Sequence, residues 1–194
     1  HSMRPLPLAS TSPARKQLLD GLKLPYTVSA PQVDEARQPG ESAMAMVSRL
    51  AEAKARAVAA LQSATLVIGA DQVAALGDDI LGKPGNHAQA VQQLQRVSGQ
   101  HITFYTGLCL LNSATGATQV EVIPCTVVFR ELNTTQIENY LRLEQPYQCA
   151  CSFRSEGPGA ALTERLIGDD PSALIGLPLI RLTRMLEQEG MYLI

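Results

Sequence analysis

The chain has 194 residues, of which 45% are hydrophobic, and its formal net charge at pH 7 is −2. This length and composition allow a core of globular size, in one domain or in two small lobes that share a core. The charge balance argues against a protein that coats a nucleic acid, because such a protein needs an excess of cations over a run of phosphates. A small anionic ligand, which needs only a few well-placed cations, remains compatible with it.

The lack of a recognisable sorting signal and the pattern of the cysteines predict a cytoplasmic protein. Every apolar run is shorter than the roughly 18 residues of a membrane span, and we find no signal peptide. His1-Ser2 is typical of an expression-tag remnant, so we expect a single domain over residues 4–194. Cys149 and Cys151 would face the same way on a strand and could bind a soft metal. Buried reduced thiols are the favoured interpretation, because the cysteines lie in apolar surroundings without C-x-x-C spacing.

Helical and strand-like segments alternate along the chain. In chain order, apolar spacing, helix caps and turn residues predict a strand over 5–9, a helix over 13–21, a strand over 26–29, an irregular stretch over 31–40, a helix over 42–61, a strand over 66–70 that ends at Asp71, a loop over 82–85, a helix over 88–97, a β-hairpin of 101–111 and 118–129, a helix over 133–143, a short strand near Ser152, a strand over 162–167 and a helix over 179–189. The alternation indicates an α/β architecture, and the antiparallel hairpin makes its sheet mixed.

The first candidate site is the turn between the first strand and the first helix. Free N–H groups at a helix start, beside the hydroxyls of Ser10 and Ser12 and the guanidinium of Arg15, form a typical phosphate site. The same residues are compatible with an ordinary helix cap and a surface arginine.

Asp71 is the second candidate, because it directly follows the buried run 66–70. Open α/β sheets bind ligands at the carboxyl ends of their strands. A carboxylate there can hold a metal or activate a water, although a turn-forming aspartate would give the same pattern.

Two lysines are candidate counter-charges for phosphate. Lys54 lies on the apolar stripe of its helix, four residues after Leu50 and four before Val58. It either snorkels outward or faces a cleft. Lys83, in a loop rich in Gly and Pro, is either a solvated loop residue or a second such cation.

The remaining candidates are acidic. Glu35, beside Asp34, could join Asp71 around Mg²⁺, which prefers a few carboxylates plus substrate oxygens. Glu156 lies in a Ser-Glu-Gly stretch, and solvated loop acids are the alternative for both places. The sequence lacks the G-x-x-x-x-G-K-[ST] and G-x-S-x-G motifs and has too few histidines for a histidine metal site. Any chemistry therefore depends on carboxylates, cations and a metal.

Eight short strings, in order and with matching spacing from residue 4 to about 190, resemble the Maf family of nucleotide pyrophosphatases. They are L-A-S-T-S-P-A-R (8–15), V-D-E (33–35), L-A-E-A-K-A (50–55), G-A-D-Q-V (69–73), G-K-P (82–84), F-Y-T-G-L (104–108), S-F-R-S-E-G (152–157) and I-G-L-P (175–178).

The resemblance implies a mixed α/β fold like that of inosine triphosphatase, with two lobes and a central cleft. It also implies a cytoplasmic enzyme that releases pyrophosphate with a divalent metal, Mg²⁺ or Mn²⁺. The resemblance assigns Asp71 as the proton acceptor. It also implies that residue 14, Gln72 and Glu156 determine substrate specificity. The latter two match the subgroup that hydrolyses 7-methyl-GTP, whereas Ala14 departs from the large residue of the relatives.

Together these observations give one mechanistic hypothesis. Asp71 deprotonates a water that attacks the α-phosphorus, and Mg²⁺ joins phosphate oxygens to Glu35 and Asp71. Glu156 neutralises the cationic methylated purine or accepts its edge N–H groups. The predicted phosphate contacts all carry a hydroxyl, amine or guanidinium group: Ser10, Ser12, Arg15, Lys54 and Lys83.

Three alternatives stay open: the same reaction on UTP, dTTP or a modified pyrimidine, a non-catalytic nucleotide-binding regulator, and a nucleic-acid-binding module. The last is disfavoured because the sequence pI is about 5.9 and only three Phe, five Tyr and no Trp are available for stacking. We therefore expect a nucleoside triphosphate as partner, without nucleic acid or membrane. A homodimer is favoured only because it is the commonest oligomer.

Overall fold

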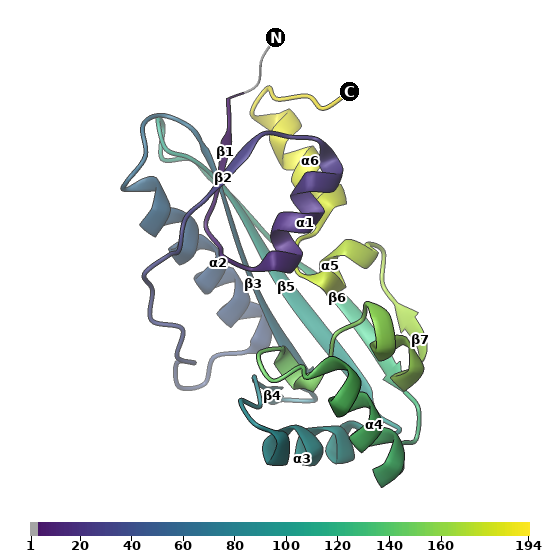
Figure 1. Ribbon diagram of the computed structural model, residues 1–194. Coiled ribbons are helices and arrows are strands. Elements are labelled where there is room, and N and C mark those ends of the chain that lie inside the picture. The colour runs from purple at the N-terminus through teal and green to yellow at the C-terminus, as the bar shows by residue number, and fades with distance from the viewer. Residues whose placement is uncertain (1–3) are drawn as a thin grey trace.

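The computed structural model describes residues 4–194, so the predicted tag remnant at residues 1–2 lies outside the described residues. Strands and helices alternate from β1 to α6 (Figure 1). Their bounds are β1 Leu6–Leu8, α1 Pro13–Leu22, β2 Tyr26–Val28, α2 Ala43–Ala59, β3 Leu66–Leu76, β4 Asp79–Leu81, α3 His87–Val97, β5 His101–Asn112, β6 Thr118–Phe129, α4 Thr134–Glu144, η1 Ala150–Ser152, η2 Gly157–Leu162, β7 Thr163–Ile167, α5 Pro171–Ile175 and α6 Leu179–Gln188.

Within these residues, seven strands form one mixed sheet. The strand order is β2-β1-β3-β5-β6-β7, and β4 pairs with β3. β1 is parallel to both β2 and β3, whereas β3, β5, β6 and β7 form antiparallel pairs. The predicted α/β fold with a mixed sheet and a long hairpin is therefore confirmed.

One face of the sheet is covered by α2, which lies close to the long strands. A Cβ atom on Gly69 would lie 2.2 Å from the Ala51 carbonyl oxygen, and one on Gly107 would lie 2.2 Å from that of Val47. Both distances are far below van der Waals contact, and both partners are helix backbone. The two glycines therefore allow α2 to pack directly on β3 and β5.

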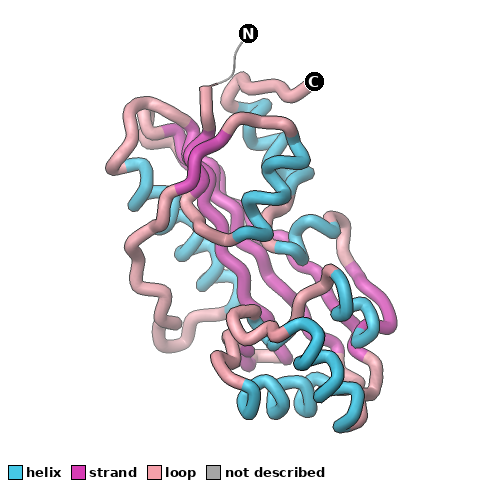
Figure 2. The backbone as a smooth tube through the Cα atoms, viewed as in Figure 1, coloured by secondary structure: helices cyan, strands magenta, loops and turns pink. Residues whose placement is uncertain are grey.

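The other face carries two groups of helices at its two ends (Figures 1 and 2). A first hydrophobic cluster includes residues of α1, α6 and β1, such as Leu8, Leu19 and Met185. A second cluster includes residues of α3 and α4, such as Leu94 and Ile137. The two clusters match the two lobes implied by the family resemblance.

Asp71 does not lie at the end of its strand, so that prediction was wrong. β3 continues to Leu76, because its second half pairs with β5 and with β4. The polar pair Asp71-Gln72 interrupts the apolar run, which is also the pattern of a strand end. On the β1 side, the register runs only to the pair of Leu8 and Ile68, and β4 pairing begins at Ala74. Asp71 thus lies between the two neighbouring strands on that edge.

The segment around Ser152 also differs from the predicted strand. Residues 150–152 form the short 3₁₀ helix η1, in which Cys151 and Ser152 have φ values of 60° and 55°. Left-handed backbone is not compatible with a strand, so Cys149 and Cys151 do not share a strand face. All four cysteines are free, as predicted, but Cys149 is only partly buried. The helices of residues 4–194 all fall short of the length or apolar character needed to cross a bilayer.

Candidate active site

A buried lysine and two carboxylates form the centre of the candidate site. The Lys54 Nζ atom lies 2.7 Å from Asp71 Oδ1 and 3.0 Å from Glu35 Oε1. The side chains of Lys54 and Asp71 are each 9% exposed, whereas that of Glu35 is 60% exposed. Lys54 therefore points into the protein from α2 rather than snorkelling to the surface, and it joins the irregular loop before α2 to β3.

The surroundings of Asp71 act on its pKa in opposite directions. Burial, the largest effect, raises the pKa of this carboxyl above its usual value, and the charge of Glu35 adds to the rise. The charge and hydrogen bond of Lys54, and then the charge of Arg15, lower the pKa. Asp71 is therefore a carboxylate with increased proton affinity that pairs with Lys54 and lies within electrostatic reach of Arg15.

The turn before α1 combines a helix cap with an anchored arginine. The Ser12 hydroxyl accepts the Arg15 N–H at 3.3 Å, and Pro13 occupies the first turn. The Ser10 hydroxyl accepts the Ser12 N–H at 3.0 Å and Arg15 Nη1 at 3.4 Å. Arg15 Nε donates to the Gly176 carbonyl at 2.8 Å. The guanidinium is thus fixed from two sides, and Ser12 does act as an ordinary cap.

Arg15 is electrostatically linked to the two carboxylates. Burial lowers the pKa of its guanidinium, and the charges of Asp71 and Glu35 oppose that effect. The structure therefore brings together Arg15, Lys54, Asp71 and Glu35, with Ser10 and Ser12 beside the arginine.

Gln72 faces the opposite side of β3 from Asp71, as strand alternation requires. Its Nε2 atom donates to the Leu174 carbonyl at 2.9 Å, and the Ala173 carbonyl and the Thr106 hydroxyl each lie 3.1 Å away. These acceptors come from α5 and β5, so the amide N–H groups are used within the protein. The side-chain oxygen is the part of Gln72 that can accept a hydrogen bond from a ligand.

Glu156 and Lys83 belong to the second lobe. Glu156 accepts Arg154 Nε at 2.9 Å and the Ser155 hydroxyl at 3.1 Å. Lys83 is exposed in the loop after β4. That loop is joined to the segment before Glu156, because the Cys151 N–H donates to the Gly82 carbonyl at 3.1 Å. Lys83 and Glu156 therefore lie on connected segments, apart from the ion-pair centre.

Residue 14 lies on the first turn of α1 and is partly buried. As an alanine it offers a methyl group where a large side chain would offer a stacking surface, so base stacking at this position is not available from the chain itself.

Several supporting residues were not predicted. Thr106 and Gly176 lie in two of the strings quoted above, but no role was assigned to them. Asp170 is 5% exposed, and its carboxylate accepts the backbone N–H groups of Ser172 and Ile180 at 2.9 and 3.1 Å. An Asp before a Pro at a helix start is a capping signal that could have identified it.

Two carboxylates of the site could contribute to a metal site. Residues 4–194 contain no group of three His, Cys, Asp or Glu side chains that could hold an ion without other ligands. Oxygens of Glu35 and Asp71 nevertheless converge on one cation, the Lys54 ammonium. This is the number of carboxylates that Mg²⁺ commonly takes when substrate phosphates supply the rest.

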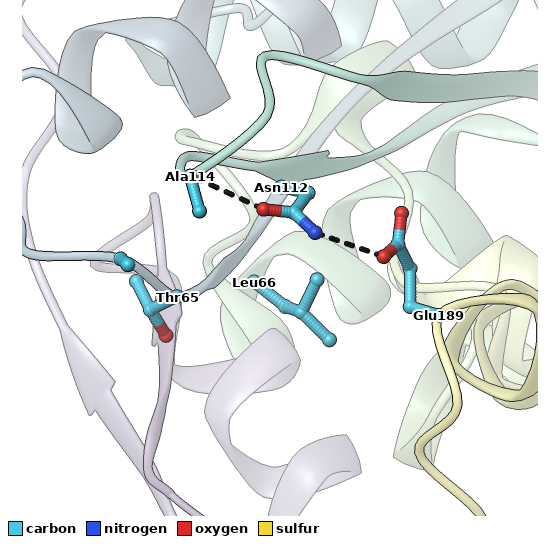
Figure 3. Close-up of a pocket in the computed structure, with 6 residues that line it drawn as sticks. Thr65, Leu66, Asn112, Ala114 and Glu189 are labelled. Atoms are coloured by element: carbon cyan, nitrogen blue, oxygen red, sulfur yellow. Dashed lines mark hydrogen bonds between the residues drawn. The ribbon is translucent and has the colours of Figure 1, made fainter.

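A hollow at the start of β3 is separate from this centre (Figure 3). Its lining includes Leu66, Asn112 and Glu189. Asn112 Nδ2 donates to Glu189 Oε2 at 3.0 Å, and Asn112 Oδ1 accepts the Ala114 N–H at 3.0 Å. The asparagine amide is thus used within the protein, and the hollow is not our candidate site.

The chain matches one protein family and several named relatives. The family described as Maf-like protein matches residues 5–189. The chain is 57% identical over 185 residues to the 7-methyl-GTP pyrophosphatase of Nitrosococcus oceani, covering 95% of this chain and 93% of the relative. It is 55% identical over 188 residues to the 7-methyl-GTP pyrophosphatase of Pseudomonas fluorescens, covering 97% of this chain and 98% of the relative.

Among solved structures, the Ham1 protein of Staphylococcus aureus matches with a TM-score of 0.47 and 14% identity, over 66% of this chain and 73% of that one. The family match spans nearly all the described residues. The chain belongs to the Maf family.

Proposed function

We propose that this protein is a nucleoside triphosphate pyrophosphatase that hydrolyses 7-methyl-GTP to 7-methyl-GMP and pyrophosphate. The observation that carries the chemistry is the buried Lys54 ammonium between the carboxylates of Asp71 and Glu35. The choice of substrate is supported by relatives named 7-methyl-GTP pyrophosphatase at 57% and 55% identity. We infer a cytoplasmic enzyme in which residues 4–194 act as one unit on a free nucleotide, with a homodimer as the simplest assembly.

In this proposal, Asp71 is the general base. Burial raises the pKa of its carboxyl, so it accepts a proton more readily than an exposed aspartate. It orients and deprotonates a water that attacks the α-phosphorus of the nucleotide. The bond from this phosphorus to the bridging oxygen breaks, and pyrophosphate leaves with the electron pair.

The cations of the site bind the phosphates. Arg15 is held by Gly176 and Ser10, so it meets the triphosphate in a fixed orientation. Lys54 lies beside the base, and the exposed Lys83 approaches from the second lobe. The hydroxyl oxygens of Ser10 and Ser12 accept hydrogen bonds within the protein, and their O–H groups donate to the phosphate oxygens.

Glu35 and Asp71 would hold the divalent metal, Mg²⁺ or Mn²⁺. Their oxygens already converge on the Lys54 ammonium, so a second cation that shares them with substrate phosphates fits this donor set. When bound, the metal supplies charge neutralisation for the phosphates.

The second lobe supplies base recognition. A purine methylated at its ring nitrogen is cationic, and both Glu156 and the free oxygen of Gln72 are acceptors that favour such a base. Gln72 lies between Ala70 and Ala74, which belong to the hydrophobic clusters of different lobes. This position supports a role for Gln72 between the lobes.

The test is pyrophosphate release from 7-methyl-GTP, GTP, UTP, dTTP and CTP with Mg²⁺, with Asp71→Asn and a metal-free sample as controls. We expect release chiefly from 7-methyl-GTP, none from Asp71→Asn, and retained nucleotide binding by that variant. Release chiefly from pyrimidine nucleotides would contradict the substrate and point to Ala14. Nucleotide binding without pyrophosphate release from any nucleotide would instead favour a non-catalytic nucleotide-binding regulator.

A second variant tests the base contact. Glu156→Gln removes the negative charge and should reduce the preference for 7-methyl-GTP over GTP by about 1–3 kcal/mol, the value of a good bidentate contact to a base. The ratio of the two kcat/KM values measures this preference. An unchanged ratio would exclude Glu156 as the specificity residue.

A further inference from the structure

Glu35 lies in a loop that has to be held in place. Residues 29–42 connect β2 to α2 as an irregular segment, and the Glu35 side chain is 60% exposed. Its carboxylate nevertheless reaches the buried Lys54 Nζ at 3.0 Å. An exposed side chain on a loop loses conformational entropy when it is fixed, so other contacts must define the loop conformation.

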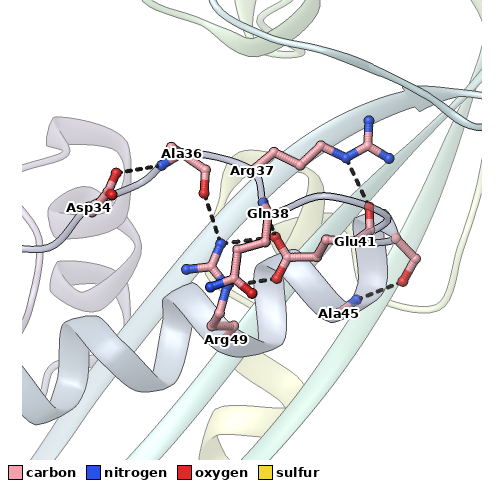
Figure 4. Close-up of polar contacts among 8 residues, drawn as sticks. Asp34, Ala36, Arg37, Gln38, Glu41, Ala45 and Arg49 are labelled. Carbon is pink, nitrogen blue, oxygen red and sulfur yellow. Dashed lines mark hydrogen bonds and ion pairs between the residues drawn. The ribbon is translucent and has the colours of Figure 1, made fainter.

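Those contacts converge on Arg49 of α2 (Figure 4). Arg49 Nε lies 2.7 Å from Glu41 Oε2, and Arg49 Nη2 lies 2.9 Å from Glu41 Oε1. This is a bidentate pair, the strongest arrangement of an arginine with a carboxylate. Arg49 Nη2 also donates to the Ala36 carbonyl at 3.0 Å, one residue after Glu35.

Glu41 extends this clamp along the loop. Its Oε1 atom accepts the Gln38 N–H at 3.0 Å, and its backbone carbonyl accepts Arg37 Nε at 2.9 Å. On the other side of Glu35, the Asp34 carboxylate accepts the Ala36 N–H at 3.0 Å. Both backbone polar groups of Ala36, the residue directly after Glu35, are therefore hydrogen-bonded.

Arg49 and Lys54 are on the same helix, five residues and about 7.5 Å of helix axis apart. The clamp thus fixes the loop relative to the element that carries the partner of Glu35. We propose that Arg49, together with Glu41, is a positioning residue that holds the Glu35 carboxylate toward Lys54 and the metal. This inference rests on the proposed function in one respect, because the proposed function places a metal at Glu35 and Asp71.

The clamp is charged across the physiological pH range. The hydrogen bonds of Arg49 and of the Gln38 N–H lower the pKa of Glu41 to about 2. The same hydrogen bond raises the pKa of the Arg49 guanidinium, and the charges of Asp34 and Asp71 add to that rise. The pair therefore acts as a permanent support rather than as a pH switch.

The experiment measures Mn²⁺ affinity by electron paramagnetic resonance of the protein saturated with a nucleotide analogue that has a methylene group in place of the oxygen between the α- and β-phosphates, because phosphate oxygens complete the metal site. The variants are Arg49→Gln, Arg49→Lys, Glu35→Gln and the double variant Arg49→Gln with Glu35→Gln. Arg56→Gln is the matched control, because it removes an Arg–Glu pair of the same helix, with Nε and Oε2 2.9 Å apart, on the exposed surface. Thermal unfolding and amide hydrogen exchange of residues 34–41 accompany each variant.

We expect Arg49→Gln to weaken Mn²⁺ binding about tenfold or more, as is typical when the support of a metal ligand is removed. Arg49→Lys keeps the charge but not the bidentate geometry, so it should fall between wild type and Arg49→Gln. Exchange of residues 34–41 should accelerate in both. Arg56→Gln should leave Mn²⁺ affinity unchanged.

The double variant separates positioning from a direct charge effect. If Arg49 acts through Glu35, Arg49→Gln has no further effect on Mn²⁺ affinity once Glu35 is Gln. An equal loss in both backgrounds, or unchanged affinity in Arg49→Gln or Glu35→Gln, would overturn the proposal. Absence of nucleotide hydrolysis by a wild-type protein with this Mn²⁺ pattern would overturn the proposed function and leave the positioning role intact.

Discussion

Two ion pairs of the site have similar geometry but different surroundings. Lys54 Nζ and Asp71 Oδ1 are 2.7 Å apart, and both side chains are 9% exposed. Arg154 Nε and Glu156 Oε2 are 2.9 Å apart, but their side chains are 48% and 37% exposed. Water screens the second pair and not the first, so burial rather than distance decides how much each pair contributes.

This difference in burial suits the two pairs to different functions. The charges of the buried pair act in a low dielectric, where they have a large effect on developing charge in a transition state. The side chains of the exposed pair can replace their mutual contact by contacts with water, so they can rearrange around a base. In the proposed function, the first pair therefore takes part in the chemistry and the second in recognition of the base.

The largest expected effect is on the buried pair. Lys54→Met leaves the Asp71 carboxylate buried without its closest counter-charge, so the free energy of unfolding should fall by about 3 kcal/mol. Chemical denaturation measures this loss. Adding Asp71→Asn should recover part of it, because the unpaired charge is removed. A Lys54→Met protein as stable as wild type would show that the buried pair contributes no more to the free energy of unfolding than the exposed pair does.

A second prediction concerns the pH dependence of turnover. Burial raises the pKa of Asp71, so kcat/KM should decline on acidification at a pH above the ordinary aspartate value of 3.8. Below that pKa the carboxyl keeps its proton and cannot accept another. Lys54 is the largest influence that lowers the pKa. In the residual turnover of Lys54→Gln, the acid limb should therefore move to higher pH, and an unmoved or lower limb would contradict Asp71 as the base.

The smallest expected effect is on the exposed pair. Glu156→Ala removes this pair alone, because Arg154 Nη1 keeps its pair with Glu144 Oε1 at 3.1 Å. It should change the free energy of unfolding by no more than about 0.2–1 kcal/mol, the value of a solvent-exposed ion pair. It should raise the KM for 7-methyl-GTP, because an acceptor for the cationic base is lost. Parallel unfolding and kinetic measurements test both statements, and a large stability loss would show that exposure is a poor guide to the contribution of a pair.

Local signals in the sequence predicted most elements of the fold. Ser12 before Pro13 and Asn133 before α4 are caps in the structure, as their residue types indicate. The long hairpin followed from alternation and a turn. Such features depend on neighbours within a few residues, and these are visible in a single sequence.

The missed features depend on distant partners. β3 continues past Asp71 because the pairing with β5 extends to the pair of Ala75 and Thr103, which no local pattern shows. Gln72 binds carbonyls of α5 that lie 101 and 102 residues further along the chain. The family strings therefore predicted which residues to consider for the candidate site, but not the ion pairs and loop contacts that the structure shows among them.

The close packing of α2 has a consequence for how the protein tolerates mutation. A methyl group added at Gly69 would collide with the Ala51 carbonyl oxygen, which as helix backbone cannot turn aside. The whole helix would have to shift outward, and the Lys54 ammonium would move away from Asp71 with it. A residue without any functional group thus sets the spacing of the ionic centre. In a saturation mutagenesis screen, Gly69 would appear as essential as the charged residues it never touches.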